Sequence, residues 1–441
     1  MNVHLIAIGG SVMHNMALAL KSKGYNVTGS DDNIFEPSRS RLEKAGILPK
    51  KMGWFPEKIS VKLDAIILGM HARIDNPELN EAKKLNIPIY SFPEYIYNES
   101  KHKKRIVIGG SHGKTSITAM ILHVLNDLKI DADYMIGAQI EGFETMVKIT
   151  KDAPIIILEG DEYLSSAIDR RPKFHLYQPH IAVLSGIAWD HINVFPTLEN
   201  YIEQFKIFKN KVKETLIYYS KDKNIQEILK DGTKCKLIPY DTPDYIIKDG
   251  KTIIDNTELL IFGSHNMENL TAAKIVCTQL GIKENVFYKS IKNFKGASKR
   301  LELIKKSSNY SIYKDFAHSP SKLCATINAV KEQFPSRKLI ACMELHTFSS
   351  LNSKFLSQYE NSMSNADIAI IYYNPDSISR KKLDTITEDQ IRNSFSKENL
   401  LIFKKSEELK LFLRSINWKE KNLLMMSSGD FNGINFETLI L

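Results

Sequence analysis

The residues Gly110-Ser111-His112-Gly113-Lys114-Thr115-Ser116 combine glycines, a lysine and hydroxyl groups in an order that suits phosphate binding. Glycines let backbone N–H groups close around phosphate oxygens, and a following helix adds the positive end of its dipole. Lys114 would contact the terminal phosphates of a nucleotide, and the Thr115 hydroxyl would bind Mg²⁺. The spacing is shorter than in GxxxxGK[ST], because two residues separate Gly110 from Gly113. The alternative is an ordinary glycine turn before a helix.

Two apolar segments further along the chain end in side chains that bind metal ions. The segment APIIILEGDEY (153–163) predicts a buried strand that ends in the acids Glu159, Asp161 and Glu162. The segment HIAVLSGIAWDHINVF (180–195) predicts another strand, followed by Asp190 and His191. Acids at the carboxyl end of a parallel strand, beside a phosphate loop, are positioned to hold Mg²⁺. A solvated strand end and a structural histidine are the alternatives.

The N-terminal residues have the order of a nucleotide-binding unit. VHLIAIGG (3–10) predicts a strand that ends in glycines, a helix follows, and YNVTGSDD (25–32) predicts a second strand that ends in Asp31. Strand, glycine turn, helix, strand and acid is the dinucleotide-binding layout, although Gly9-Gly10-Ser11 replaces GxGxxG. Gly10, Ser11 and Asp31 are therefore candidates for nucleotide contacts.

Alternating strands and helices continue to the end of the chain and predict an α/β protein with parallel sheets covered on both faces. The length of 441 residues fits about three domains of roughly 150 residues each. We predict an N-terminal Rossmann-like domain (1–100), a central P-loop ATPase-type parallel sheet (105–297) and a C-terminal Rossmann-like domain (298–441). The basic run Lys101–Arg105 is interpreted as a linker.

The composition is that of an ordinary globular enzyme, with 43% hydrophobic and 25% charged residues. The net charge of +9 is spread over many lysines, which would suit an anionic nucleotide substrate, and we expect no nucleic-acid partner. The four cysteines form no CxxC pair and indicate reduced thiols. No signal peptide or membrane-length apolar run is present, so we expect a cytoplasmic protein without membrane insertion.

Further motifs complete the series. The segment FGSHNMENLTAAKIV (262–276) predicts a helix with Asn266 and Asn269 on one face, where amides would pair with or stack on a base. The segment YSIYKDFAHSP (310–320) predicts a strand followed by Asp315 and His318.

In this order the motifs resemble those of the Mur ligases, the ATP-dependent amide-forming enzymes of peptidoglycan synthesis, over nearly the whole chain. GGSHGKTS is similar to the family's GTHGKT loop, LEGDEY to its EADE motif, and GSHNMENLTAA to its HNxxN helix. SKRLEL is similar to its arginine motif, and DFAHSP to the DxxHHP motif of the branch that acts on muramate. The family's carbamate-forming lysine has no match near residues 201–205.

The resemblance implies ATP and Mg²⁺ as cofactors, and UDP-N-acetylmuramate and an amine as substrates. It implies that Lys114 contacts the β/γ-phosphates, Thr115 binds one Mg²⁺, and Glu159 with His191 binds a second. The adenine would lie against Asn266 and Asn269. It also implies that Arg300 and Asp315 contact the nucleotide, that His318 lies near the reacting groups, and that Gly10, Ser11 and Asp31 bind the UDP-sugar.

Two branches of the family compete for the identity of the amine. IDRRPKFHLYQP (168–179), VTGSD and MSSGDFNGI resemble the ligases that join L-alanyl-γ-D-glutamyl-meso-diaminopimelate to UDP-N-acetylmuramate, which favours that tripeptide and peptidoglycan recycling. The alternative is ligation of L-alanine in primary synthesis. Ser319 replaces a second histidine, and His346, a candidate for substrate contact, replaces an expected arginine of the tripeptide branch.

Two readings from other classes stay open at this point. The first domain would suit NAD in an oxidoreductase, although no hydride-transfer site is recognisable. The other reading is a phosphate-loop protein with a purely regulatory role. Three features argue against this reading: the ordered acids, the pair Asp190-His191 and the Arg300 motif.

Overall fold

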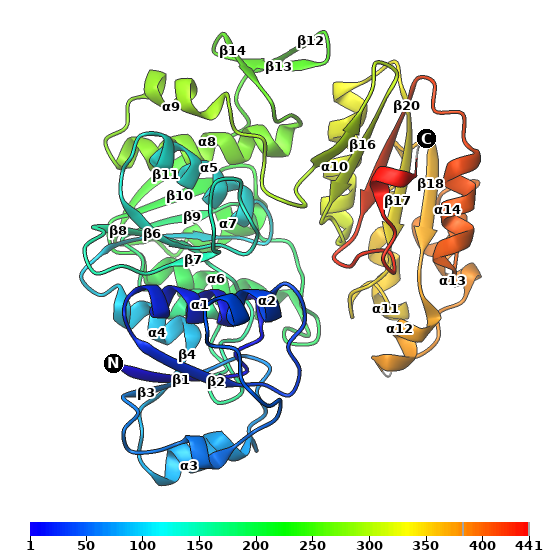
Figure 1. The fold of residues 1–441 in the computed structure, drawn as a ribbon. Helices are drawn as coiled ribbons and strands as arrows, with labels where there is room; N and C mark the ends of the chain where they lie inside the picture. Colours follow the sequence, from blue (N-terminus) through cyan, green and yellow to red (C-terminus); the bar gives the residue numbers. More distant parts are fainter. Residues whose placement is uncertain (382, 440–441) are drawn as a thin grey trace. The chain divides into compact units, whose positions relative to one another are not determined.

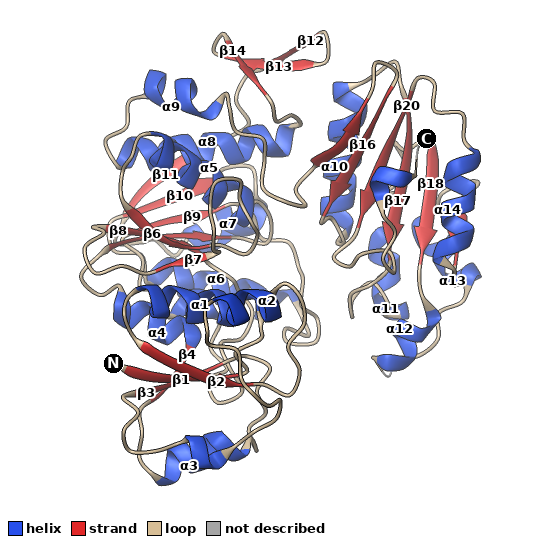
Figure 2. Ribbon diagram, viewed as in Figure 1, coloured by secondary structure: helices blue, strands red, loops and turns tan. Residues whose placement is uncertain are grey.

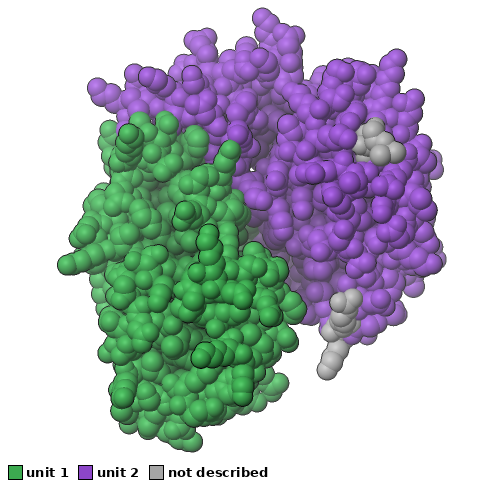
Figure 3. All heavy atoms as spheres, viewed as in Figure 1, with its two compact units in different colours: residues 1–187, 199–240, 275–281 green, residues 188–198, 241–274, 282–441 purple. Residues whose placement is uncertain are grey.

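The structure is a computed structural model, and it describes residues 1–381 and 383–439. These residues form two compact units (Figure 3). Unit 1 comprises residues 1–187, 199–240 and 275–281, and unit 2 comprises residues 188–198, 241–274 and 282–441. The chain therefore passes between the units several times, and the segment 188–198 leaves unit 1 and returns to it. The boundaries predicted for the three domains stay a prediction.

The N-terminal part of unit 1 is a parallel four-stranded sheet in the order β2-β1-β3-β4 (Figure 1). Its strands are β1 Asn2–Ile6, β2 Asn26–Ser30, β3 Ala65–Leu68 and β4 Ile89–Ser91. Its helices are α1 Ser11–Ser22, α2 Ser38–Lys44, α3 Pro77–Lys84 and α4 Phe92–Glu99. The first strand, helix and second strand agree with the predicted nucleotide-binding order.

The central sheet of unit 1 has seven strands in the order β11-β10-β9-β5-β8-β6-β7. All neighbours pair in parallel except β6 and β7. The strands are β5 Lys104–Gly109, β6 Ala132–Met135, β7 Val147–Lys148, β8 Ile155–Glu159, β9 Ile181–Leu184, β10 Thr215–Tyr219 and β11 Lys236–Tyr240.

Helices cover both faces of this sheet, because the chain winds away from β5 in both directions (Figure 2). They are α5 Lys114–Asp127, α6 Leu198–Asn210 and α7 Lys223–Leu229. Strands β5, β8 and β9 lie side by side at the centre, so the loops that follow them meet at one edge. The phosphate loop and the acids after β8 are thereby neighbours.

The segment 101–105 differs from the predicted linker. Lys103 and Arg105 are buried, and β5 begins at Lys104. The Lys103 ammonium donates to Asp133 Oδ2 at 2.7 Å, and Arg105 donates to the backbone oxygens of Ser100 and Tyr177. Burial is tolerated because each charge is satisfied by hydrogen bonds.

The C-terminal sheet of unit 2 has six strands in the order β15-β16-β20-β17-β18-β19, with only β15 antiparallel. The strands are β15 Glu302–Lys306, β16 Tyr310–Asp315, β17 Lys338–Glu344, β18 Ile368–Tyr372, β19 Leu401–Phe403 and β20 Lys421–Met426. The helices are α10 Pro320–Gln333, α11 Ser353–Leu356, α12 Pro375–Arg380, α13 Glu388–Phe395 and α14 Ser406–Ser415.

Two cores lie on opposite faces of this sheet, as the alternation of strand side chains requires. Along β17, Ala341 and Met343 belong to the cluster that contains Leu323 of α10, whereas Ile340 belongs to the cluster that contains Leu409 of α14. The predicted α/β class, with helices on both faces of a parallel sheet, is confirmed.

Helices α8 Ser264–Gln279 and α9 Glu284–Ile291 precede this sheet in the chain. A small antiparallel sheet, which the sequence prediction did not include, is formed by β12 Ile246–Lys248, β13 Lys251–Ile254 and β14 Thr257–Leu259. Its turns, Asp249-Gly250 and Asp255-Asn256, all have positive φ, which is typical of tight hairpins. Among the described residues, no helix combines the length and the apolarity needed to cross a membrane.

Candidate functional site

The phosphate loop joins β5 to α5 in unit 1. Gly110 and Gly113 have positive φ values of 130° and 73°. At Gly110 a Cβ atom would lie 2.2 Å from Ser185 Oγ, so the loop packs against the residues after β9. Ser185 Oγ donates to the backbone oxygen of His112, and Ser111 N donates to the backbone oxygen of Gly186 at 2.8 Å. The loop is thus braced from outside, with α5 beginning directly after Gly113.

The ammonium of Lys114 lies inside this loop. It donates to the backbone oxygen of Gly110 at 2.6 Å and to Glu162 Oε2 at 2.7 Å. Burial by itself would lower the pKa of Lys114, but the carboxylates Glu162 and Asp161 outweigh it, and the pKa is raised. Lys114 is therefore charged at neutral pH. Ser116, the last residue of the phosphate-loop motif, lies in the first turn of α5 and is buried.

Thr115 and Glu159 lie together at the end of β8. The Thr115 hydroxyl donates to Glu159 Oε1 at 2.9 Å, and Gly137 N donates to Glu159 Oε2 at 2.7 Å. A hydroxyl and a carboxylate within hydrogen-bond distance form a hard oxygen donor set, which fits Mg²⁺. The structure thus brings Thr115, predicted to bind one Mg²⁺, next to Glu159, predicted to bind a second.

The third predicted ligand, His191, belongs to unit 2, so its sharing of an ion with Glu159 stays a prediction. His191 has a positive φ of 56°, and its N–H donates to Asp190 Oδ1 at 2.7 Å. Asp190 Oδ2 in turn lies 3.8 Å from Lys322 Nζ and 4.0 Å from His318 Nε2. Burial by itself would raise the pKa of Asp190, but the nearby ammonium of Lys322, with smaller contributions from His191 and His318, outweighs burial, and the pKa is lowered.

His318 follows β16 and its ring is mostly buried. Burial, reinforced by Lys322, lowers the pKa of His318 to about 3, so the ring is neutral at physiological pH. Its Nδ1 lies 2.8 Å from the backbone oxygen of Phe316, which fixes the proton on Nδ1. The side of the ring that faces Asp190 is then an acceptor.

Asp315, at the end of β16, organises the same loop. Its carboxylate accepts hydrogen bonds from Leu301 N and Ala317 N, both at 2.6 Å. The Arg300 guanidinium lies 4.6 Å from the centre of the Phe316 ring. Asp315 thus holds the residue after Arg300 in position.

Asn266 and Asn269 lie within the first turns of α8 and are both buried. The Asn266 amide donates to the backbone oxygen of Phe262 at 2.9 Å. The structure therefore places the pair one turn apart on the helix, as the spacing predicted, with one amide already bound to the backbone.

The nucleotide candidates of the N-terminal sheet lie together. Gly10 is the N-cap residue of α1 and Ser11 is its first residue, and Asp31 follows β2. Asp31 Oδ2 accepts a hydrogen bond from Gly9 N at 2.7 Å. Burial raises the pKa of Asp31 to about 6 despite this hydrogen bond, so the carboxylate changes its charge near neutral pH.

His346 follows β17 and is 37% exposed, with Nδ1 3.7 Å from Glu344 Oε1. Glu344 is buried and accepts hydrogen bonds from Phe431 N at 2.9 Å and from Ser427 Oγ. Sequence reasoning missed Glu344, although an acid that ends the apolar run KLIACME was a usable signal. The neighbours Thr347 and Ser350 hydrogen-bond to each other within a turn.

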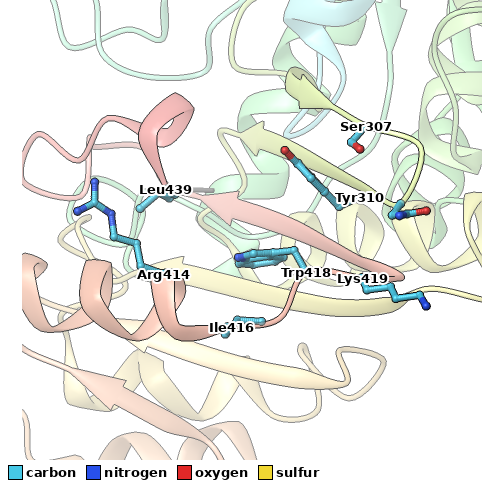
Figure 4. A pocket seen from close by; sticks show the side chains of 8 residues that line it. Ser307, Tyr310, Arg414, Ile416, Trp418, Lys419 and Leu439 are labelled. Carbon is cyan, nitrogen blue, oxygen red and sulfur yellow. The ribbon is translucent and has the colours of Figure 1, made fainter. Parts of the chain in front are cut away.

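Unit 2 contains a pocket of about 410 Å³ (Figure 4). Tyr310 and Lys419 line it at the amino ends of β16 and β20, whereas Asp315 and Glu344 lie at the carboxyl ends. Because the predicted site residues follow carboxyl ends, we assign this pocket no part in the reaction.

Comparison with known proteins supports the motif order. Residues 2–104 match the family described as Mur ligase family, catalytic domain, and residues 108–277 match the Mur ligase middle domain. A UDP-N-acetylmuramate–L-alanine ligase of Sulfurihydrogenibium sp. (strain YO3AOP1) is 28% identical, over 98% of this chain and 96% of the relative. The enzyme of the same name from Lactobacillus acidophilus is also 28% identical, over 89% of each chain.

Solved structures share the three-domain fold. UDP-N-acetylmuramate–alanine ligase MurC of Thermotoga maritima superimposes with a TM-score of 0.71 at 20% identity, over 98% of this chain and 96% of the other. The murein peptide ligase Mpl of Psychrobacter arcticus superimposes with a TM-score of 0.67 at 20% identity, over 98% and 97%. With two family domains that together span more than half of its residues, the chain belongs to the Mur ligase family of ATP-dependent ligases.

Proposed function

We propose that the chain joins the lactyl carboxylate of UDP-N-acetylmuramate to the amine of L-alanyl-γ-D-glutamyl-meso-diaminopimelate, with ATP as the energy source, in peptidoglycan recycling. The observation that carries the ATP chemistry is the phosphate loop, in which the charged Lys114 and the Thr115–Glu159 pair lie at adjacent positions. A loop so equipped suits the transfer of a phosphoryl group.

The reaction requires activation of the carboxylate, because an amine cannot displace oxide or hydroxide at neutral pH. Transfer of the γ-phosphoryl group of ATP to the lactyl carboxylate gives an acyl phosphate and ADP. Attack by the amine nitrogen on the acyl carbon then breaks the bond to phosphate, which leaves as the amide forms and the nitrogen loses its proton. The protein contributes mainly position and charge neutralisation.

Within this scheme Lys114 neutralises charge on the β/γ-phosphates, assisted by the N–H groups of the loop from Gly110 to Ser116. Bound Mg²⁺ would supply further positive charge to the transferring phosphoryl group: Thr115 would hold one ion, and Glu159 with His191 would hold a second. Asn266 and Asn269 would hold the adenine. Arg300 and Asp315 would contact the remainder of the nucleotide, and His318, which is neutral, would act as an acceptor near the amine.

Gly10 and Ser11, at the amino end of α1, would bind the diphosphate of the UDP-sugar, since a helix N-terminus attracts anions. Asp31 would accept hydrogen bonds from ribose hydroxyls. His346 would contact the amine substrate.

The tripeptide is favoured by the segment 168–179, which resembles the tripeptide-ligating branch and has a defined structure here. Asp169 and Arg171 form a bidentate ion pair, and Lys173 pairs with Asp161, two residues beyond Glu159. The segment is thereby fixed next to the metal-ligand candidate. The second candidate, L-alanine, is favoured by the name of the curated relatives described above.

Phosphate release tests the proposal. Purified chain with ATP, Mg²⁺ and UDP-N-acetylmuramate should release phosphate when the tripeptide is added, and kcat/KM for the tripeptide should exceed that for L-alanine at least about tenfold, or about 1.4 kcal/mol. A preference for L-alanine would move the chain to the second candidate. No amine-dependent phosphate release with either compound would reject both.

A further inference from the structure

Lys114 is held by a carboxylate that the mechanism above does not use. Glu162 Oε2 accepts from the Lys114 ammonium at 2.7 Å, and the Glu162 side chain is only 2% exposed. A phosphate group that enters the loop would compete with Glu162 for the same ammonium. Binding of ATP is therefore an exchange, in which Lys114 leaves Glu162 for the phosphate.

Tyr201 of α6 contacts both Glu162 and the loop. Its hydroxyl donates to Glu162 Oε1 at 3.0 Å and lies 2.8 Å from Ser111 Oγ. Because the single phenolic proton is directed to Glu162, the Ser111 hydroxyl must donate to Tyr201. The Tyr201 side chain is fully buried, so these hydrogen bonds form in a region of low dielectric.

The exchange removes the Lys114 ammonium from the buried Glu162 carboxylate. Asp161 keeps its ion pair with Lys173, and Glu159 keeps the backbone donor Gly137 N. Of these three acids, Glu162 is the one that loses a direct ion pair when Lys114 moves, while Asp161 loses a weaker electrostatic interaction. A buried carboxylate in this state is stabilised by hydrogen-bond donors and by a newly arrived cation.

We propose that Tyr201 is a positioning residue that acts through Glu162: its hydroxyl stabilises the Glu162 carboxylate once Lys114 has moved to the phosphate. A divalent cation that arrives with ATP lowers the cost of the same step. The proposal rests on the phosphate-binding role of Lys114 given under Proposed function.

Two nearly isosteric substitutions have opposite expected effects on ATP binding by the full chain, measured by calorimetry with and without Mg²⁺. Glu162→Gln removes the competing charge, so metal-free ATP should bind about tenfold more tightly, and the advantage of Mg²⁺ should shrink. Tyr201→Phe removes the donor that Glu162 needs after the exchange, so ATP with Mg²⁺ should bind roughly fivefold more weakly.

The double variant gives the decisive comparison. If Tyr201 acts through Glu162, Tyr201→Phe should have no further effect in the Glu162→Gln background. Tyr134→Phe is the matched control, since Tyr134 is a buried tyrosine of the same unit whose hydroxyl donates to the backbone oxygen of Thr145. This control should leave ATP affinity unchanged in both backgrounds.

Equal effects of Tyr201→Phe in both backgrounds, or none in the wild type, would overturn the proposal, as would weaker binding of metal-free ATP to Glu162→Gln. Lys114→Ala separates this failure from failure of the proposed function. If Lys114→Ala leaves ATP affinity unchanged, the phosphate role of Lys114 is wrong, and the inference is wrong with it. If Lys114→Ala weakens ATP binding while the double variant is additive, only the inference is wrong.

Discussion

At the scale of single residues, Lys114 has two partners that respond differently to its loss. The incoming phosphoryl group would lose a neutralising charge, and the buried Glu162 would lose its ion-pair partner. We predict that Lys114→Ala lowers kcat at least about 100-fold, corresponding to about 3 kcal/mol, and also lowers the melting temperature. Phosphate release and thermal unfolding measure the two effects.

The double variant Lys114→Ala with Glu162→Gln separates the effect on activity from the effect on melting temperature. It should regain part of the lost melting temperature, because no buried charge is left without a partner, while its activity stays low. Turnover near the wild-type value in Lys114→Ala would contradict the assignment of Lys114.

Asp31 is expected to make UDP-sugar binding depend on pH. Since burial raises the pKa of Asp31 to about 6, the carboxylate is ionised only above that pH. We predict that KM for UDP-N-acetylmuramate falls as pH rises from 5 to 7, and that Asp31→Asn abolishes this dependence.

The raised pKa of Asp31 also affects the stability of the fold. Substrate binding should improve as pH rises, whereas the contribution of Asp31 to the free energy of unfolding should decrease. A carboxyl group with a raised folded-state pKa stabilises the fold at pH values below its ordinary pKa, and this contribution is lost as pH rises through about 6. We therefore expect the free energy of unfolding, measured with urea from pH 4 to 7, to fall less steeply with pH in Asp31→Asn than in the wild type. The difference in slope should be up to about 1.4 kcal/mol per pH unit. Parallel curves would show that Asp31 is ionised throughout.

At the scale of elements, the phosphate loop keeps its shape through packing against the residues after β9. At Gly110 a Cβ atom would lie 2.2 Å from Ser185 Oγ and 2.9 Å from Ser185 N. We predict that Gly110→Ala displaces the loop, lowers kcat/KM for ATP at least about tenfold and destabilises the fold by roughly 1–3 kcal/mol.

Gly24 provides the control for backbone strain alone. Its φ is also positive, at 89°, but a Cβ atom there would meet nothing within 4 Å. Gly24→Ala should thus cost stability without affecting ATP kinetics. If Gly110→Ala behaves like Gly24→Ala in both assays, the contact with Ser185 does not shape the loop.

The elements that could be predicted from the sequence are those specified by local patterns. The strand and helix around the phosphate loop follow from an apolar run, glycines and a helical period. Lys103 and Arg105 could not be placed, because a basic run has the same sequence pattern whether it is solvated or buried. Their burial depends on Asp133 and on backbone oxygens that only the folded chain brings near.

The contacts of the candidate site were predictable only where one motif contains both partners. Lys114 and Thr115 were assigned from the loop itself. Tyr201 was missed, because its contact with Glu162 depends on how α6 packs against the sheet, and a tyrosine on an amphipathic helix is indistinguishable from a core residue in the sequence. Glu344 was missed for a similar reason.

At the scale of the whole molecule, the prediction to test is that Glu159 of unit 1 and His191 of unit 2 are ligands of one Mg²⁺. We predict that Glu159→Gln and His191→Ala each raise the Mg²⁺ concentration needed for half-maximal activity about tenfold or more. Together they should cost less than the sum of the single effects, because residues that share one ion act as a unit.

Glu203→Gln, at an exposed acid on α6, is the control and should leave the Mg²⁺ dependence unchanged. Strict additivity of the two ligand substitutions in ΔΔG‡ would show that Glu159 and His191 do not share an ion.

The path of residues 188–198 has a consequence for synthesis on the ribosome. Ile192 packs against a core cluster of unit 2 whose members extend to Met426. At about 5–20 residues per second, the last of these partners is translated roughly 10–50 s after Ile192 itself. Until then the segment that contains Asp190 and His191 has no complete surface on which to dock, and it is open to chaperones and proteases. A nascent chain thus acquires its phosphate loop and Glu159 well before it can fix His191, the histidine proposed to share an ion with Glu159.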